Sequence, residues 1–205
     1  MPSFPDPETR NVLLPGCARC PGLADCRERI AWGNGPADAD VVVVGEAPAP
    51  GDPDADRWRG GNQTGMAYTS RHSGRRIRNL FADLGYDPYY TNAVKCFPQD
   101  PEDPTTNREP TPAERRRCGA HLRTEIETVD PDVVVATGKH ATESVARLAG
   151  RSVDGFLDSV VSPLACPELG ATLLPILHPS YQEVWLARLG YDREEYRAAI
   201  EAQLP

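Results

Sequence analysis

Lysine is nearly absent from this chain. Lys95 and Lys139 are its only lysines, and arginine supplies the rest of the positive charge. A reaction that proceeds through a lysine amine therefore has no candidate nucleophile with a clear place in a site. The net charge is −8, which disfavours general binding to nucleic acid. Any contact with phosphates must come from local clusters of arginine.

Long apolar runs are also absent. No stretch approaches the ~18 apolar residues that a membrane span requires, and residues 1–6 lack the basic patch and apolar run of a secretory signal. We therefore expect no membrane association and a cytoplasmic location. The chain has 205 residues, 40% of them hydrophobic, which suits one buried core and is short for two. We expect a monomer with a single domain over residues 1–205, in which residues 1–14 are a poorly structured extension.

Four short apolar runs predict strands, at residues 41–44, 89–94, 133–136 and 173–177. Because these runs are almost entirely apolar, they indicate burial on both faces, as in a parallel sheet. Helical patterns alternate with them at residues 74–84, 111–129, 139–149 and 193–203. The second of these begins with Thr111, Pro112 and Glu114, a capping box. The alternation predicts an α/β fold of three layers, α/β/α, around a mostly parallel four-stranded sheet.

Polar residues stand where three of the predicted strands end. Gly45 and Glu46 follow the first strand, Asn92 lies late in the second, and His178 follows the fourth. In open α/β sheets, ligands bind beyond the carboxyl ends of the strands. The sequence therefore predicts that these residues converge at one rim.

Six cysteines occur, and a disulfide framework is improbable in a cytosolic chain of this size. Cys17 and Cys20 form a closely spaced pair that can chelate a metal from a turn. Cys96 and Cys118 supply two remote thiols. From the residues alone, this set fits a structural zinc as well as an iron–sulfur cluster. Two or three buried thiols without a metal are a third interpretation.

Several short motifs stand in one order along the chain: 42–48 (VVVGEAP), 91–96 (TNAVKC), 107–114 (NREPTPAE) followed by Cys118, and 178–181 (HPSY). Together they resemble the family-four uracil-DNA glycosylases of bacteria and archaea, over roughly residues 15–200. The resemblance implies the uracil-DNA glycosylase fold and a partner, DNA with single or double strands. It implies hydrolysis of the bond between uracil and deoxyribose, without a lyase step, which leaves an abasic site for base excision repair. It also implies a 4Fe-4S cluster on Cys17, Cys20, Cys96 and Cys118, with zinc as the alternative.

The resemblance assigns roles that the chemistry supports. The amide of Asn92 can donate to uracil O4 and accept from N3–H, whereas cytosine presents the reverse polarity. His178 would donate to uracil O2 as negative charge develops there, and Glu46 would orient or activate a water. Tyr68 stands where the family has a stacking Phe. The predicted catalytic residues are thus Glu46, Asn92 and His178, and the predicted substrate-binding residues are Gly45, Ala47, Tyr68, Asn92 and His178.

Two segments are predicted to contact DNA. Arg71, Arg75 and Arg76 cluster at the start of the first predicted helix, where they could meet phosphates. The resemblance implies that Ser180, Tyr181 and Gln182 form the loop that enters the minor groove and fills the gap left by the flipped base.

Residues 51–74 depart from the family-four pattern. The runs 60–65 (GGNQTG) and 71–74 (RHSG) look more like the related family five, which accepts a broader set of damaged bases. The range of deaminated bases beyond uracil is therefore open. Two other functions are consistent with the residues: a catalytically weak DNA-binding protein that senses damage or redox state through its cluster, and a zinc-containing nucleotide hydrolase.

Overall fold

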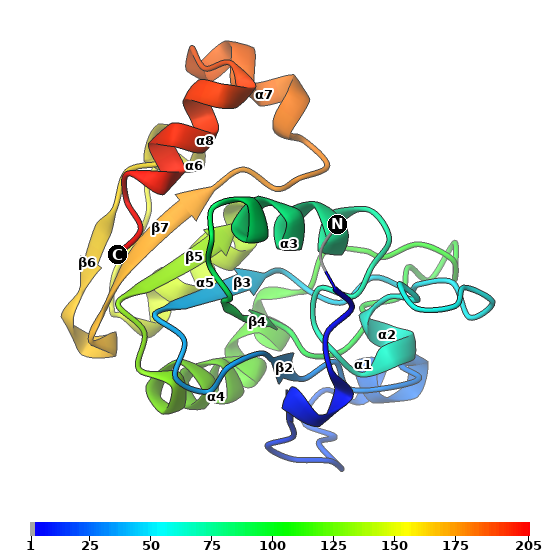
Figure 1. Ribbon diagram of the computed structural model, residues 1–205. Helices are drawn as coiled ribbons and strands as arrows, with labels where there is room; N and C mark the ends of the chain where they lie inside the picture. Colours follow the sequence, from blue (N-terminus) through cyan, green and yellow to red (C-terminus); the bar gives the residue numbers. More distant parts are fainter. Residues whose placement is uncertain (1–2) are drawn as a thin grey trace.

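Seven strands form one sheet in the computed structural model, which describes residues 3–205 (Figure 1). Their order across the sheet is β1-β2-β4-β3-β5-β7-β6. The four central strands are parallel, and the outer strands β1, β2 and β6 are antiparallel to their neighbours. The bounds are β1 (Arg10–Asn11), β2 (Gly33–Asn34), β3 (Val41–Gly45), β4 (Tyr89–Asn92), β5 (Val133–Thr137), β6 (Leu164–Cys166) and β7 (Ala171–Ile176).

The prediction of a four-stranded sheet is wrong, because the sheet has seven strands. The four expected strands are its parallel centre, β3, β4, β5 and β7. The three additional strands are two or three residues long, too short to show an apolar period in the sequence. One of them, β1, lies within residues 1–14, where a poorly structured extension is expected, and Pro7–Thr9 beside it forms a 3-10 helix, η1.

Helices cover both faces of the sheet, which confirms the three-layer α/β/α architecture (Figure 1). On one face, α4 and α5 pack against Val42, Val44 and Val134. On the other face, α3, α7 and α8 pack against Val41 and Val43. Successive side chains of a strand point to opposite faces, so the valine run of β3 serves both cores. The bounds are α1 (Pro21–Cys26), α2 (Gly61–Thr64), α3 (Ser73–Asp83), α4 (Pro112–Val129), α5 (Lys139–Leu148), α6 (Phe156–Ser159), η2 (Pro167–Leu169), α7 (Gln182–Leu189) and α8 (Arg193–Glu201).

The start of α4 has the predicted capping box. The Thr111 hydroxyl accepts from the Glu114 N–H at 3.2 Å, and the Glu114 carboxylate accepts from the Thr111 N–H at 2.7 Å. Pro112 occupies the first turn, where its missing N–H costs nothing. This cap fixes where the helix that carries Cys118 begins.

A third, smaller core lies beside the sheet. Leu23, Ile30, Trp32 and Val94 form it with Cys96, and Cys17, Cys20 and Cys118 pack against it. This core joins the segment around α1 to the end of β4 and to α4. Among residues 3–205, no helix has the length and apolar character needed to cross a membrane.

Candidate active site and cysteine pocket

Gly45, Asn92 and Tyr68 meet at the carboxyl ends of β3 and β4. Gly45 and Asn92 are register partners on these adjacent parallel strands. A Cβ atom placed on Gly45 would lie 2.5 Å from Asn92 Oδ1 and 2.9 Å from Tyr68 Oη. Glycine is therefore the residue that leaves room for the other two side chains.

The side chain of Asn92 is buried, with 4% of the residue exposed. In the described part of the chain, no protein group forms a hydrogen bond with its amide. Its backbone carbonyl, in contrast, accepts from Lys95 Nζ at 2.6 Å. The amide atoms are not among the fully buried polar atoms that lack a partner, so they keep some contact with solvent, and this amide is suited to bind a ligand.

Tyr68 is held in one position from several sides. Its hydroxyl lies 2.7 Å from Thr137 Oγ1, its ring lies 5.6 Å from that of Tyr90, and its carbonyl accepts from Arg78 Nε at 3.0 Å. Its φ of 53° is in the left-handed region, which non-glycine residues rarely adopt. Burial raises the pKa of Tyr68, so its hydroxyl stays protonated. Thr137 was not among the residues predicted from the sequence, although its place at the end of β5 puts it on the same rim.

His178 follows β7, and its ring is oriented by the loop after it. Its Nδ1 accepts from the Ser180 N–H at 3.2 Å. Burial lowers the pKa of His178, so the neutral ring predominates at pH 7. Because Nδ1 is the acceptor, the proton of the neutral ring is on Nε2. Gly138, with φ +91°, allows the close approach, since its Cβ would lie 3.3 Å from His178 Cβ.

Glu46 is half-buried directly after β3. Burial raises the pKa of this carboxyl, nearby His140 lowers it, and nearby Glu109 raises it. His140 Nε2 and Glu109 Oε2 are 3.2 Å apart. Ala47, the next residue, packs against the core that contains the cysteines.

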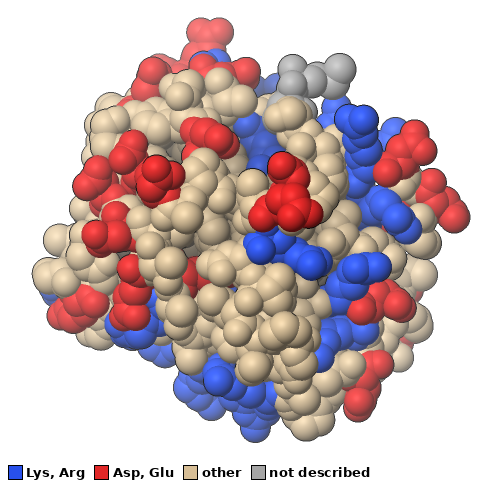
Figure 2. All heavy atoms as spheres, turned by 60° about the horizontal axis from the view of Figure 1, so that its bottom comes forward, with Lys and Arg blue, Asp and Glu red and all other residues tan. Residues whose placement is uncertain are grey.

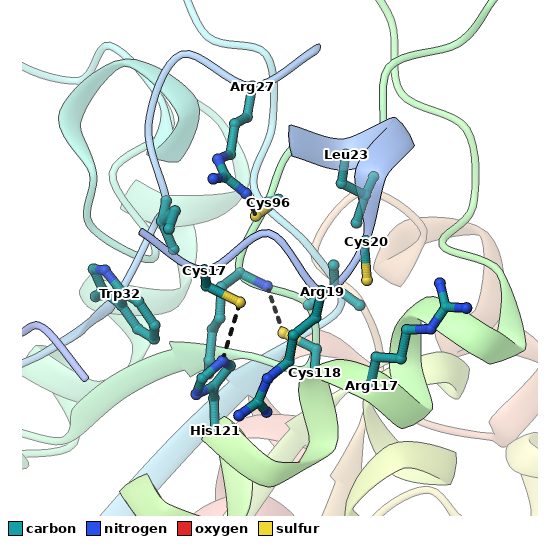
Figure 3. Close-up of a pocket in the computed structure, with 13 residues that line it drawn as sticks. Cys17, Arg19, Cys20, Leu23, Arg27, Trp32, Cys96, Arg117, Cys118 and His121 are labelled. Carbon is teal, nitrogen blue, oxygen red and sulfur yellow. Dashed lines mark hydrogen bonds between the residues drawn. The ribbon is translucent and has the colours of Figure 1, made fainter. Parts of the chain in front are cut away.

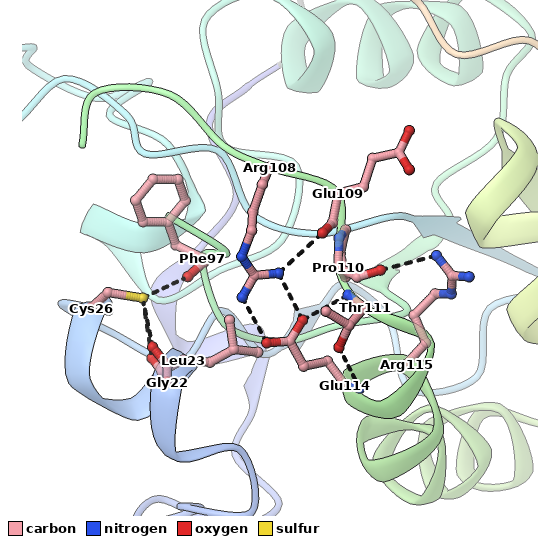
Figure 4. Close-up of polar contacts among 10 residues, drawn as sticks. All are labelled: Gly22, Leu23, Cys26, Phe97, Arg108, Glu109, Pro110, Thr111, Glu114 and Arg115. Carbon is pink, nitrogen blue, oxygen red and sulfur yellow. Dashed lines mark hydrogen bonds and ion pairs between the residues drawn. The ribbon is translucent and has the colours of Figure 1, made fainter. Parts of the chain in front are cut away.

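Residues of the motif at 107–114 hold the loop before α4 through contacts with one another (Figure 4). Arg108 forms a two-pronged ion pair with Glu114, at 2.7 and 2.9 Å, and also donates to the Glu109 carbonyl at 3.0 Å. This pairing lowers the pKa of Glu114. The contacts hold the loop before α4 in place and thereby position Glu109 close to Glu46.

The four cysteines that are predicted to bind a metal all lie in the lining of one pocket (Figure 3). Cys17 and Cys20 precede α1, Cys96 follows β4, and Cys118 lies in α4. The remaining lining is apolar and basic: Arg19, Leu23, Arg27, Ile30, Trp32, Val94, Lys95, Arg117 and His121.

Three of the four sulfurs have a nitrogen within hydrogen-bond distance. Arg27 Nη1 donates to Cys96 Sγ at 3.3 Å, and the Lys95 backbone N–H donates to Cys118 Sγ at 3.3 Å. His121 Nε2 lies 3.4 Å from Cys17 Sγ. For Cys20, the nearby Arg117 guanidinium acts to lower the pKa of the thiol, against the larger effect of burial.

Burial opposes ionisation of three of these thiols. It raises the pKa of Cys20 and Cys96, and it raises the pKa of Cys118 to about 12. The nitrogen partners act in the opposite direction, because N–H donors stabilise a thiolate. His121 was not among the residues predicted from the sequence. It lies three residues after Cys118 and thus on the same side of α4. Within the described residues, no group of three or more His, Cys, Asp or Glu side chains is arranged to hold a single metal ion.

The segments predicted to contact DNA lie side by side. Arg76 Nη1 of α3 donates to the carbonyl of Pro179 at 3.1 Å, which joins α3 to the loop before α7. Arg71, Ser180 and Tyr181 are exposed, and Gln182 is half-buried at the start of α7. The Arg75 guanidinium lies 5.8 Å from the centre of the Trp58 ring.

Charge is not spread evenly over the surface. On the face drawn in Figure 2, basic side chains gather toward the lower and right parts, and acidic side chains predominate on the left. A net charge of −8 therefore coexists with local basic surface.

Comparison with known proteins places this chain in a family. Residues 32–204 match the model of the Uracil DNA glycosylase superfamily. The chain is 30% identical to a type-4 uracil-DNA glycosylase of Thermotoga maritima, over 80% of this chain and 77% of the relative. It is 30% identical to a type-5 uracil-DNA glycosylase of Pyrobaculum aerophilum, over 86% and 83%, and 29% identical to a type-5 enzyme of Mycobacterium tuberculosis, over 87% and 74%. These matches confirm the resemblance read from the motifs: the chain belongs to the uracil-DNA glycosylase superfamily.

Proposed function

We propose that this chain is a monofunctional uracil-DNA glycosylase of base excision repair. The observation that carries the proposal is the amide of Asn92 beside Gly45, which belongs to a residue only 4% exposed and has no protein partner among the described residues. In the reaction, the bond between C1′ and uracil N1 breaks and its electron pair leaves with uracil. A water oxygen bonds to C1′ and loses a proton to solvent or a base. The product is free uracil and an abasic site in an unbroken strand.

Asn92 reads the base in this proposal. Its amide nitrogen donates to uracil O4 and its oxygen accepts from N3–H. Cytosine has a donor and an acceptor in the reverse order, so a fixed amide leaves both of its groups mispaired. Sites that rely on buried hydrogen bonds reject such mismatches by ~10⁴-fold or more.

His178 stabilises the leaving group. The bond from the Ser180 N–H to Nδ1 leaves Nε2–H as the donor of a neutral ring. A donor of this kind, offered to uracil O2 where negative charge develops, contributes about 3 kcal/mol by analogy with oxyanion holes. The lowered pKa of His178 keeps the ring neutral, so it needs no counterion.

Glu46 and Tyr68 complete the site. In its ionised form, the half-buried Glu46 carboxylate orients or activates the attacking water. Tyr68 stacks on the flipped base, and the bond between its hydroxyl and Thr137 satisfies the polar group that a phenylalanine would lack. Gly45 and Ala47 bring the backbone after β3 close to the base.

DNA is the partner. We assign phosphate contacts to Arg71, Arg75 and Arg76, and entry into the minor groove to Ser180, Tyr181 and Gln182. The bond from Arg76 to Pro179 supports this assignment, because it joins the two segments.

We further propose that Cys17, Cys20, Cys96 and Cys118 hold a 4Fe-4S cluster. Such a cluster takes four cysteine thiolates, and the N–H donors to Cys96 and Cys118 favour the thiolate form of those two residues. Zinc, the alternative, requires ligands that converge on one ion, with sulfur at ~2.3 Å. When bound, the cluster would hold residues 17–20 against β4 and α4, and it supplies no step of the hydrolysis. A brown protein with a broad absorption band at about 400 nm would support the proposal of a cluster, and a colourless protein that contains zinc would refute it.

We also propose that the protein acts as a monomer in the cytoplasm. In support, the large apolar side chains exposed among the described residues are Val12, Leu14, Tyr181 and Val184, and Tyr181 lies on the segment assigned to DNA. The base range extends to other deaminated bases, as the family-five-like loops suggest. A panel of uracil, hypoxanthine, xanthine and thymine in single- and double-stranded DNA measures that range.

The function is tested with an oligonucleotide that carries one uracil. With enzyme in excess, wild-type protein should leave a site that alkali cleaves, and a strand that stays intact after alkali refutes the proposal. His178→Ala should slow excision by about 10²–10³-fold, and Asn92→Ala should also slow it strongly. Gln203→Ala, which truncates an amide in the C-terminal segment, is the matched control and should leave the rate unchanged. Activity that survives both rim substitutions contradicts the site assignment.

A further inference from the structure

Lys95 is buried beneath the rim, with 1% of its side chain exposed. Its Nζ makes three contacts: an ion pair with the Glu125 carboxylate, a hydrogen bond to Thr91 Oγ1 at 2.5 Å, and one to the backbone carbonyl of Asn92 at 2.6 Å. A lysine ammonium has three donors, so every one of them is used. One of these three donors bonds to Asn92, the residue that would read the base.

Glu125 completes the network from α4, and its side chain is fully buried. Its Oε2 accepts from Lys95 and from Thr91 Oγ1, the latter at 2.6 Å. Its Oε1 accepts from the Gly33 N–H at 3.0 Å and from Tyr89 Oη at 3.2 Å. A buried network in which each donor and acceptor is matched fixes a single geometry for its members.

A contribution to stability does not by itself explain why Lys95 and Glu125 are buried as an ion pair. Burying two charges costs desolvation that their attraction only just repays, and well-packed apolar residues often replace a buried ion pair without loss of stability. The Lys95–Glu125 pair does something that an apolar pair would not do, because it holds the carbonyl of Asn92 in a fixed direction.

The same residue also reaches the cysteine pocket. The Lys95 backbone N–H donates to Cys118 Sγ at 3.3 Å, and Cys96 is its neighbour in the chain. The side chain and the backbone of Lys95 thus join the end of β4 to two positions on α4, Cys118 and Glu125.

We propose that Lys95, paired with Glu125, is a positioning residue that fixes the orientation of the Asn92 amide. The inference rests on the proposed role of Asn92 in uracil recognition. The amide of Asn92 has no protein partner of its own among the described residues, so its direction depends on the backbone that carries it. A shift of about 1 Å in a positioned group can cost 10²-fold in rate.

The test replaces both charges together, Lys95→Met with Glu125→Met, so that neither is left buried alone. Single-turnover excision of uracil should fall by about 10²-fold, whereas KM for the DNA should stay near that of wild type, since phosphate contacts lie elsewhere. Arg123→Met with Glu127→Met is the matched control, because it removes an ion pair of 3.2 Å from the same helix, together with the bond from Arg123 to the Leu148 carbonyl. That control should excise uracil at the wild-type rate.

A double-mutant cycle separates positioning from general damage. If Lys95 acts through Asn92, the same pair of substitutions should have almost no further effect in the Asn92→Ala background. An equal loss in both backgrounds overturns the inference, and so does a wild-type rate in the Lys95/Glu125 variant.

Should the double variant fail to fold, Thr91→Val takes its place in the cycle, because it removes one hydroxyl of the network and keeps a β-branched shape. A loss of activity that vanishes in the Asn92→Ala background supports the inference, and an equal loss in both backgrounds overturns it. Inactive wild-type protein would instead refute the proposed function, so the two failures are distinguishable.

Discussion

The substitution Gly45→Ala tests the contact on which base recognition depends. Gly45 is not among the glycines with positive φ, so its backbone accepts alanine and only space opposes the change. The new Cβ would lie 2.5 Å from Asn92 Oδ1, whereas ordinary contact begins at 3.4 Å. The amide must therefore retreat by the difference, 0.9 Å. Displacement of about 1 Å at a positioned group costs about 10²-fold in rate.

The assay is single-turnover excision from an oligonucleotide with one uracil, with enzyme in excess. We expect Gly45→Ala to excise about 10²-fold more slowly than wild type and to lose about 1–3 kcal/mol of unfolding free energy from overpacking. Gly119→Ala is the matched control. It also adds a methyl group to a buried glycine, but its Cβ would lie 3.4 Å from Leu148 Cδ2, so its rate should equal that of wild type.

A folded Gly45→Ala protein that excises uracil at the wild-type rate would refute this reasoning. It would mean that the Asn92 amide can move by nearly 1 Å without consequence, and that the fixed amide is not what reads the base.

Other parts of the structure yield further expectations. Lys95→Met alone leaves the Glu125 carboxylate buried and unpaired, so urea denaturation should show that the free energy of unfolding falls by about 3–5 kcal/mol. Replacing Glu125 by Met as well should recover most of this loss. Equal losses in the single and double variants would show that the pair is not coupled. Burial raises the pKa of Glu46 above its ordinary value of 4.5, so its carboxylate form is lost as pH falls through that raised value. The acid limb of kcat should therefore have its midpoint above 4.5 and should disappear in Glu46→Gln, whereas a limb that persists assigns it to another group. The ring of His121 lies 5.2 Å from that of Trp32, and His121→Phe keeps a ring there but removes the nitrogen next to Cys17. The visible absorption of the proposed cluster should therefore decay faster in the presence of an iron chelator. An unchanged decay rate would contradict the role given to that nitrogen.

The central strands could be predicted from the sequence because of how they are buried. β3, β5 and β7 are packed on both faces, so each appears as an unbroken apolar run. β1 and β2 contain Arg10, Asn11, Gly33 and Asn34, whose composition is that of a turn. They join the sheet only because the tertiary fold brings them to its edge. Local patterns cannot reveal such pairing.

The rim could be predicted because it follows from topology. Once the strands are parallel, the residues after Gly45 and Ile176 and those at the end of β4 must lie at one edge. The contacts that orient the rim join residues far apart in the chain. Tyr68 meets Thr137 across 69 positions, and Lys95 meets Glu125 across 30. Neither pair has a spacing that a single sequence would mark.

The mass of the treated oligonucleotide tests the central claim most directly. After incubation of a strand that carries one uracil with the purified protein, and without alkali, mass spectrometry should show free uracil and an unbroken strand in which water has replaced the base. The same strand with cytosine in place of uracil should keep its mass. A uracil strand of unchanged mass, or a strand already broken before alkali is added, would contradict the account.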